Sequence, residues 1–407
     1  MLFLLLGSIS LSAQNVYDDF AGVYAPYKFE SSRVTPAPRG YEAFYISHIG
    51  RHGSRYAVDF PYVNKGLAPL LRADTLGILT PRGKKLLKDF VTLDSLSQGL
   101  YGFLCQRGYV EHEGIALRMA ENYPQVFRGR DSILCQSTHI QRCIQSSWSF
   151  CIALKGAYPK LAFRQLAGEK YFAVLCNVKS PKLRRIVRSG AAMIEDYLNE
   201  NFDLEGFFSS IFTDMNAAGR LNVKLSFLLE CIFTNGAMAR YLGVPTLSEF
   251  LTPEESEVVA RAYNAKLFVN NCASAENEPA RALSSAPLLE DVLSRADAAV
   301  AGNKIAADLR FTHDSGIMPY LSLIKLKGYE YAYSYDEARR CWDATELIPM
   351  GTNVQMIFFR NRSGRVLVKL LFNEKETSIP ALGPGPYYEW GTLRAYMRQC
   401  TVENDKK

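Results

Sequence analysis

The chain has 407 residues, of which 48% are hydrophobic and 22% are charged. This composition is ordinary for a globular protein and excludes a mostly disordered chain. The 47 Lys and Arg residues against 41 Asp and Glu give a formal net charge of +6, which suits an anionic ligand, while the lack of a dense Lys/Arg tract argues against nucleic-acid binding.

The N-terminus carries the long apolar run of the sequence, at residues 1–11. The run is too short to cross a bilayer as a helix. With Ser12-Ala13-Gln14 after it, it predicts a secretory signal peptide at residues 1–13 that is cleaved near Ala13. No Cys follows the run, so we expect a secreted or periplasmic protein without a stable membrane anchor.

The first part of the mature chain predicts a strand followed by helices. Residues 43–49 are typical of a buried strand, which ends at the polar segment 50–55. Thr80 as N-cap and Pro81 in the first turn predict the start of a helix. Residues 109–123 predict another helix.

A second strand and a long helical region follow. Residues 131–136 predict a short strand, and Ser137 or Thr138 is expected to cap the helix that carries Arg142. From about residue 152 to residue 298 helical periodicity dominates, which predicts a mainly helical insertion.

The last quarter of the chain predicts a strand, a helix, a hairpin and a terminal helix. The strand ends at His313 and Asp314, and the hairpin turn contains Asn361 and Gly364. The segments are 305–311, a helix from about 316, 353–359 with 366–372, and 390–400.

Together these elements predict an α/β fold with a mixed central sheet flanked by helices. We expect residues 14–151 and 299–407 to form the α/β domain, and residues 152–298 to form an inserted, mainly helical cap domain. Nine cysteines are spread along the chain without a C-x-x-C pair, so we expect mostly small core residues with one or two disulfides.

Polar clusters follow the three predicted strands, at 51–55, 137–142 and 313–314. Ligands of such sheets bind outside the carboxyl ends of the strands, so we expect the clusters to meet in one crevice. The guanidinium groups of Arg51 and Arg55 can chelate a phosphoryl group. Gly53 is expected to let the backbone approach the ligand closely.

The residue types in the clusters suit phosphoryl chemistry. Nearby arginine charges disfavour imidazolium, so His52 should be a neutral nucleophile. Arg142 in the first turn of a helix favours an anion. His313 can donate to phosphate, and Asp314 can supply a proton to the leaving group.

Each cluster also has a purely structural interpretation. Arg51 and Arg55 could belong to a surface network of arginines and carboxylates beside a bystander histidine. Arg142 could be an ordinary surface residue, and Asp314 could be the N-cap of the next helix.

The sequence resembles the histidine acid phosphatase family, branch 2 of the histidine phosphatase superfamily. R-H-G-S-R at 51–55, a distant H-D at 313–314, Arg142 within S-T-H-I-Q-R-C-I-Q-S and the F-N-E-K-E ending at 372–376 carry this resemblance. The Tyr after R-H-G-S-R, L-T-P-x-G at 79–83 and N-E-K-E look most like the multiple inositol polyphosphate phosphatases. Members of that subgroup often carry H-A-E, whereas H-D resembles the fungal and enterobacterial phytases and the glucose-1-phosphatases.

The resemblance implies a phosphoglycerate-mutase-like fold and a phosphohistidine mechanism. His52 is then the nucleophile, and Asp314 the proton donor that later assists water. The phosphate-binding residues implied are Arg51, Arg55, Arg142 and His313. No metal and no cofactor is implied, and the five histidines show no H-x-x-x-H or H-E-x-x-H spacing.

The expected substrate is a small phosphomonoester, most of all phytate or another inositol polyphosphate. A broad-specificity acid phosphatase or sugar-phosphate phosphatase is the alternative within the same class. A non-catalytic phospholigand-binding protein is an alternative from another class, and the presence of His52 and Asp314 argues against it. A mutase is a further alternative, and the export signal argues against that one.

The remaining histidines and basic groups are expected to be structural. His48, His112 and His139 should be packed or surface residues. The basic residues of 179–188 and 82–88 are expected to form solvated helix faces, unless the cap brings the first group to the outer phosphates of a substrate.

Overall fold

The computed structural model describes residues 20–31, 34–58, 64–128, 132–176, 181–277 and 279–402. The predicted signal peptide at 1–13 lies outside these residues. No helix in the described ranges is long and apolar enough to span a membrane.

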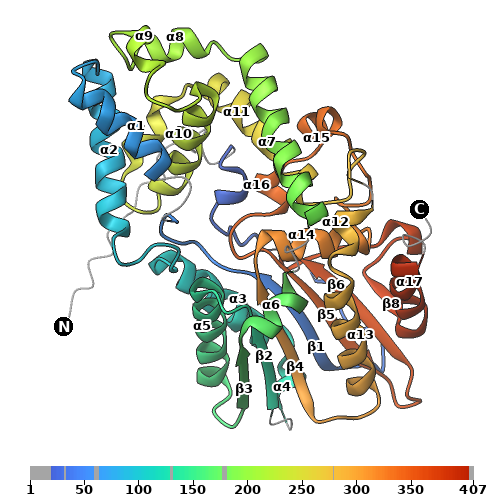
Figure 1. Cartoon of the computed structure of the whole chain (residues 1–407). Coiled ribbons are helices and arrows are strands. Elements are labelled where there is room, and N and C mark those ends of the chain that lie inside the picture. Colours follow the sequence, from blue (N-terminus) through green and yellow to red (C-terminus); the bar gives the residue numbers. More distant parts are fainter. Residues whose placement is uncertain are drawn as a thin grey trace, which may run out of the picture.

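A mixed β-sheet forms the lower layer of the molecule (Figure 1). In the described part of the chain its strand order is β3-β2-β4-β1-β5-β6-β7, with β8 paired to β6. Strands β1 to β4 pair in parallel, and β5 to β8 add an antiparallel extension. The strands are β1 Glu42–Arg51, β2 Ser132–Ser137, β3 Ala162–Ala167, β4 Ile305–Thr312, β5 Asn353–Arg360, β6 Val366–Phe372, β7 Lys375–Glu376 and β8 Tyr387–Glu389.

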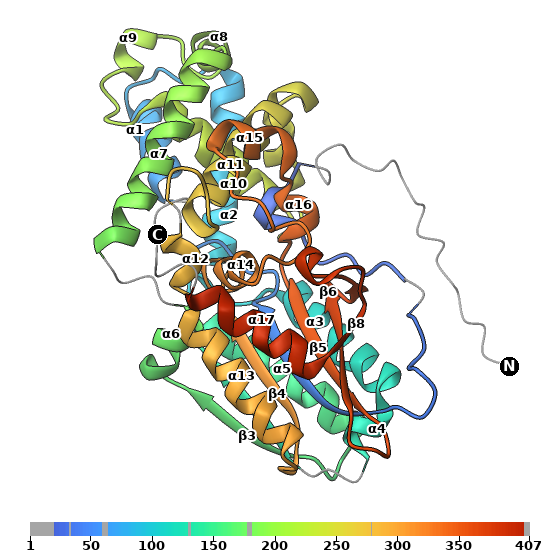
Figure 2. The ribbon, with the colours of Figure 1, turned by 90° about the vertical axis from the view of Figure 1, so that its right-hand side faces the viewer.

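Helices cover both faces of the sheet (Figure 2). On one face, apolar side chains of α3, α4 and α5 form a core with Ile46, Ile133 and Leu309 of the strands. The other face is covered by α6, α13 and α17, and α14 follows β4. These helices are α3 Gln106–Asn122, α4 Pro124–Phe127, α5 Gln141–Ala157, α6 Glu169–Leu175, α13 Ala286–Val300, α14 Asp314–Leu323 and α17 Trp390–Val402.

The upper layer is helical (Figure 1). Its helices share one apolar core with the second face of the sheet. They are α1 Asn64–Thr75, α2 Pro81–Ser97, α7 Pro181–Asn201, α8 Leu204–Ser209, α9 Met215–Ala218, α10 Leu225–Ala239, α11 Pro253–Asn271, α12 Ala280–Leu283, α15 Tyr335–Cys341 and α16 Ala344–Leu347. Short 3-10 turns are η2 Gly22–Tyr24, η4 Pro245–Phe250 and η5 Pro380–Leu382.

The predicted fold class is confirmed, and the arrangement of the helical layer differs in detail from the predicted insertion 152–298. Within that range β3 adds the edge strand of the sheet and α13 packs on the sheet. Conversely, α1 and α2 lie among the upper helices. A contact at the start of α2 joins it to this layer: Thr80 caps the helix by accepting from Gly83 N at 3.0 Å, and its hydroxyl donates to Ser210 O at 2.6 Å.

The cysteines behave as core residues and not as a disulfide framework. All nine lie in the described residues, none of them is in a disulfide, and eight of them are buried. The expected one or two disulfides are therefore not formed. Cys341 is the exposed thiol.

Two of the three histidines without an expected role are buried between the sheet and α3. His48 on β1 and His112 on α3 both pack against the ring of Phe311, and their ring nitrogens have no hydrogen-bond partner among the described residues. The pKa of each is lowered to about 3, by burial alone for His112 and by burial together with the charges of His112 and Arg310 for His48. His139 is exposed and lies against Phe172.

This burial predicts that acid weakens the fold. An unfolded histidine takes up its proton near pH 6.5, whereas the folded rings resist protonation until about pH 3. The free energy of unfolding should therefore fall as the pH decreases from 6.5 to 3, by on the order of 4 kcal/mol per ring at most. Urea unfolding at several pH values measures this dependence.

A matched pair of variants isolates the histidine contribution. His112→Phe keeps a ring of similar size and loses no hydrogen bond, so it should make stability less dependent on pH. The exposed His139→Phe should leave the dependence unchanged. If the free energy of unfolding of His112→Phe depends on pH as strongly as that of the unchanged protein, other groups cause the acid sensitivity.

Candidate active site

The carboxyl ends of β1, β2 and β4 lie side by side at the edge of the sheet below the upper helices (Figure 1). The register pairs Arg51 with Thr312 and Ser137 with Phe311. His52 continues this pairing, because its backbone N–H donates to Thr312 O at 3.0 Å. The three polar clusters expected from the sequence therefore meet at one place, as the topology predicts.

The loop after β1 is fixed by a close approach of helix α3. A Cβ atom on Gly53 would lie 2.7 Å from Gly108 O, and one on Gly108 would lie 2.1 Å from Ser54 O. Both positions therefore require glycine. This corrects the expected role of Gly53: the space beside it is filled by α3 and not by a ligand.

A buried carboxylate holds the same loop. Glu111 accepts from Ser54 N and from Ser54 Oγ, both at 2.7 Å, and from Tyr27 N at 3.1 Å. Burial raises the pKa of Glu111, although these donors and Arg107 oppose the shift. The loop that carries His52 and Arg55 is thus bound to α3 at both the backbone and the side chain of Ser54.

Arg51 is buried and rigidly held at the end of β1. Its Nη1 donates to Val23 O at 2.6 Å and to Ile348 O at 2.8 Å, and its Nη2 lies 3.2 Å from Asp314 Oδ2. This arrangement excludes the alternative of a surface arginine network. Arg51 binds the strand end, the helical layer and Asp314 together.

Arg55 and Arg142 place two more positive charges in the cluster. The guanidinium of Arg55 lies 5.7 Å from the ring centroid of Tyr24, and its Nη1 donates to Tyr56 O at 3.0 Å. Burial, and then the charge of Arg55, lower the pKa of Arg142 to about 10. The Nε atoms of Arg51, Arg55 and Arg142 are buried without a hydrogen-bond partner among the described residues. Such a concentration of guanidinium groups favours a bound anion.

His52 is held in one tautomer. Its Nδ1 lies 3.0 Å from Gly53 O, and because a carbonyl can only accept, Nδ1 carries the proton of the neutral ring. Nε2 therefore keeps its lone pair. Burial first, and then Arg142, Arg51, His313 and Arg55, hold the pKa of His52 well below its ordinary value. The ring stays neutral in mild acid, as the sequence predicts.

His313 lies beside His52, with ring centroids 5.5 Å apart. Its Nε2 is 3.1 Å from Thr138 Oγ1, and Cys143 Sγ lies 3.6 Å from the same nitrogen. Burial, and then Arg142, lower the pKa of His313 to about 3. The neutral ring can still donate one hydrogen bond.

The predicted cap of α5 is wrong. Ile140 occupies the N-cap position and makes no side-chain cap bond, because Ser137 ends β2 and Thr138 turns toward His313. The structural alternative for Asp314 also needs correction. His313 is at the N-cap of α14, and Asp314 is its first residue.

Asp314 bridges Arg51 and the start of α14. Oδ2 contacts Arg51, and Oδ1 accepts from Ser315 N at 2.6 Å. Burial raises the pKa of Asp314, but Arg51, His313 and the Ser315 N–H outweigh it, so the pKa lies below its ordinary value. The side chain keeps 29% of its surface exposed, so it remains accessible to a ligand.

The site does not contain an evident metal centre. Within the described residues no three His, Cys, Asp or Glu side chains are grouped so that they could hold a metal ion. The positive charges at the strand ends are those of Arg51, Arg55 and Arg142, and Asp314 is paired with Arg51.

Comparison with solved structures relates this arrangement to known proteins. Bifidobacterium longum multiple inositol polyphosphate phosphatase, in complex with inositol hexasulfate, matches with a TM-score of 0.78 and 18% identity over 94% of this chain and 97% of that chain. The chain has the fold of this phosphatase. The D. castellii phytase matches with a TM-score of 0.70 and 15% identity over 98% and 88% of the two chains. Hafnia alvei phytase gives 0.57 and 14% over 90% and 98%.

Comparison of sequences adds no relative. No protein-family model matches the chain, and no curated protein sequence matches it. The phosphatase fold is therefore supported by structure and by the short motifs of the strand ends.

The sequence predicts which charged residues meet at the strand ends, but it does not predict Glu111, and Thr138 is not the helix cap that the sequence predicts. Glu111 lies in a helix that was predicted, two residues after its expected start. No motif links it to Ser54. The pairing of Gly53 with Gly108, which brings α3 against the loop, is the signal that could have found it.

We expect Glu111→Gln to lower kcat by roughly tenfold and to destabilise the protein by about 1–3 kcal/mol. The amide presents an N–H₂ group where the carboxylate accepts from three donors, so the loop must shift. Steady-state kinetics and urea unfolding measure the two effects. The exposed Glu113→Gln on the same helix is the control, and equal kinetics in the two variants would contradict the positioning role.

The basic residues of α7 and α2 lie on exposed helix faces, which agrees with the expectation of solvated faces. Lys182, Arg184, Arg185 and Arg188 of α7 are exposed, and Lys179 lies outside the described residues. On α2, Arg82 donates to Phe250 O at 2.7 Å, so it serves packing within the helical layer.

Proposed function

We propose that the chain is a metal-independent phosphomonoesterase that works through a phosphohistidine at His52. The observation that carries the proposal is a neutral imidazole with a free Nε2 inside a cluster of three arginines. This arrangement binds a phosphoryl group and presents a nucleophile to it. The phosphatase fold and the family resemblance of the motifs support the same conclusion.

In the first step, His52 Nε2 attacks phosphorus in line with the leaving oxygen. The P–N bond forms as the P–O bond to the substrate breaks. Arg51, Arg55, Arg142 and the N–H of His313 stabilise the charge on the equatorial oxygens. Asp314 gives its proton to the departing alkoxide.

In the second step, water attacks the phosphohistidine. The Asp314 carboxylate accepts a proton from this water as the P–N bond breaks, and inorganic phosphate leaves with His52 again neutral. Asp314 must be protonated before the first step, although Arg51 lowers its pKa in the free protein. A bound phosphate anion opposes the field of Arg51 and so raises the pKa of Asp314.

We further propose inositol polyphosphates as the substrates. The Bifidobacterium phosphatase and Hafnia alvei phytase were each solved with an inositol hexasulfate. A sugar-phosphate phosphatase is the alternative, because H-D at 313–314 resembles the glucose-1-phosphatases as well as the fungal and enterobacterial phytases. Chromatography of inositol phosphate products over time, together with rates on phytate and glucose 1-phosphate, distinguishes the two. A higher kcat/KM on glucose 1-phosphate would reject the inositol assignment.

The proposed mechanism predicts that chelators leave the activity intact. The arginine cluster supplies the positive charge that a divalent ion supplies in other phosphatases. We expect an unchanged initial rate on p-nitrophenyl phosphate after dialysis against EDTA. Loss of activity that a divalent ion restores would contradict metal independence.

We also propose export of the protein, on the basis of the apolar run at residues 1–11. N-terminal sequencing of protein from the extracellular or periplasmic fraction tests it. A start at or near Gln14 supports cleavage after Ala13, and retention of Met1 in cytoplasmic protein would reject export.

A further inference from the structure

The N-E-K-E segment at 373–376 has no role in the proposed chemistry, yet it contains a strained turn. Asn373 and Glu374 form the two-residue turn between β6 and β7, with φ angles of 48° and 63°. Such a turn favours glycine at its second position, because a side chain is disfavoured in the left-handed region. A glutamate at this place indicates that its side chain has a role that outweighs the strain.

The Glu374 carboxylate accepts hydrogen bonds from two side chains. Its Oε1 accepts from Arg118 Nε at 2.9 Å and its Oε2 from Arg118 Nη2 at 2.7 Å, which is a bidentate ion pair. Its Oε2 also accepts from the Tyr27 hydroxyl at 2.8 Å. Only 8% of the Glu374 side chain and 23% of the Arg118 side chain are exposed, so this pair is screened less than a surface ion pair.

Tyr27 joins Glu374 to the carboxylate that holds the loop after β1. Its backbone N–H donates to Glu111 Oε1 at 3.1 Å, and Glu111 also accepts from the backbone N–H and the hydroxyl of Ser54. Burial, and then the charge of Glu374, raise the pKa of Tyr27 well above its ordinary value, so the hydroxyl stays protonated and can donate. A path of hydrogen bonds therefore leads from Glu374 to the loop that carries His52.

Helix α3 forms a second connection between Glu374 and Glu111. Arg118 and Glu111 are seven residues apart on α3, which is about two turns, so the two side chains lie on the same face of the helix. The ion pair of Arg118 with Glu374 thus fixes the helix that carries Glu111 to the end of β6.

The chain next to Tyr27 also contacts two arginines of the site. Val23 O accepts from Arg51 Nη1 at 2.6 Å, and the ring centroid of Tyr24 lies 5.7 Å from the guanidinium carbon of Arg55. A firm anchor at Tyr27 therefore also restrains the residues that hold these arginines.

We propose that Glu374 is a positioning residue for the loop 52–55. Through Tyr27 and Arg118 it fixes Glu111, and Glu111 fixes the loop. The inference rests on the proposed phosphatase function, since the loop affects turnover because it carries the nucleophile. The alternative is that Glu374 only stabilises the turn between β6 and β7, which would affect unfolding and not catalysis.

Glu374→Gln keeps the size of the side chain and removes its charge. We expect kcat on p-nitrophenyl phosphate to fall about fivefold, which is less than in Glu111→Gln because Glu374 acts one contact further away. In the double variant the loss should not exceed that of Glu111→Gln alone. Tyr27→Phe removes only the hydroxyl and should lower kcat about threefold, so it replaces Glu374→Gln if that variant does not fold.

Glu376→Gln is the matched control from the same segment. Glu376 pairs with Lys369 at 2.9 Å and accepts from Thr35 N at 2.6 Å. Within the described part of the chain none of its hydrogen bonds or ion pairs leads to Tyr27 or Glu111. This variant should lose stability and keep its kcat.

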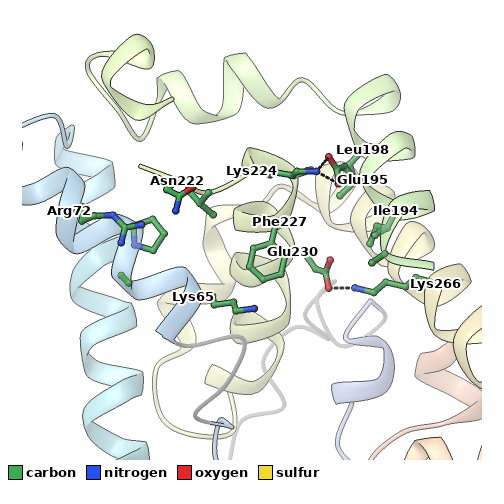
Figure 3. A pocket seen from close by; sticks show the side chains of 15 residues that line it. Lys65, Arg72, Ile194, Glu195, Leu198, Asn222, Lys224, Phe227, Glu230 and Lys266 are labelled. Atoms are coloured by element: carbon green, nitrogen blue, oxygen red, sulfur yellow. Dashed lines mark hydrogen bonds and ion pairs between the residues drawn. The ribbon is translucent and has the colours of Figure 1, made fainter. Parts of the chain in front are cut away.

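A second control lies in the helical layer. Glu195 of α7 pairs with Lys224 at 2.6 Å beside a cavity of about 570 Å³ (Figure 3), and none of the residues that line this cavity belongs to the candidate active site. Glu195→Gln removes an ion pair at this distant place and should also keep its kcat.

Hydrogen exchange tests the positioning role without turnover. The Ser54 amide is bonded to Glu111, so the peptide that contains residues 52–56 should exchange about fivefold faster in both variants of the path. The two controls should exchange there like the unchanged protein. If the unchanged protein hydrolyses no phosphomonoester, the proposed function is rejected, while the exchange rates still decide the positioning role.

Four results would overturn the inference. The first is a folded Glu374→Gln variant with unchanged kcat, and the second is an equal loss of kcat in Glu376→Gln. The third is an additive loss in the double variant, which would show that Glu374 acts independently of Glu111. The fourth is unchanged hydrogen exchange at residues 52–56 in the variants of the path.

Discussion

His52→Ala is expected to lower turnover of any phosphomonoester by at least on the order of 10⁴-fold. His313 carries the second imidazole of the site. Its Nε2 contacts Thr138 and Cys143, and its proposed role is to bind a phosphoryl oxygen. It is therefore not positioned to replace the nucleophile. Single-turnover kinetics on p-nitrophenyl phosphate measures the loss.

The variant should remain folded, because the backbone bonds of residue 52 to Thr312 and Gly351 do not involve the side chain. A urea midpoint close to that of the unchanged protein is the control. Phosphate binding through the three arginines should persist. A folded variant that retains more than about a hundredth of the rate would reject His52 as nucleophile.

Asp314→Asn is expected to affect substrates according to their leaving groups. An inositol alkoxide needs a proton as the P–O bond breaks, whereas p-nitrophenolate leaves well without one. General acid catalysis contributes roughly 10²–10⁴-fold, so the loss on phytate should reach about 10²-fold or more and be clearly smaller on p-nitrophenyl phosphate.

The structure makes this variant a suitable test. An Asn side-chain oxygen can still accept from Ser315 N, so α14 should start as before. The lost ion pair with Arg51 affects phosphate binding for both substrates alike. Equal loss on both substrates, with phosphoenzyme formation rate-limiting, would show that another group donates the proton.

The sequence was sufficient to predict β1, β2, β4, β5 and β6 and the charged residues that follow the parallel strands, but not the short strands β3, β7 and β8. Apolar runs ending in R-H-G-S-R and H-D define β1 and β4, and parallel pairing necessarily brings their ends together. The tautomer of His52 was not predictable, because it depends on a contact with Gly53 O that exists only in the folded loop. The same holds for Glu111, whose partner Ser54 is 57 residues away.

The helical layer was harder to predict for a different reason. Its apolar faces show that α1 and α2 pack, but not against which element. Thr138 illustrates the same limit locally: as a residue before a helix it resembles an N-cap, yet a buried imidazole competes for its hydroxyl. In both cases the outcome depends on residues that are far away in the sequence, which local patterns do not reveal.

Trapping of the phosphoenzyme tests the central claim most directly. Protein mixed with ³²P-labelled substrate and quenched in alkali should carry up to one phosphate, labile to acid, on the peptide that contains His52. His52→Ala should carry none. Label on another residue would contradict the phosphohistidine mechanism. So would turnover without any trapped label under conditions in which the second step, attack of water, limits the rate.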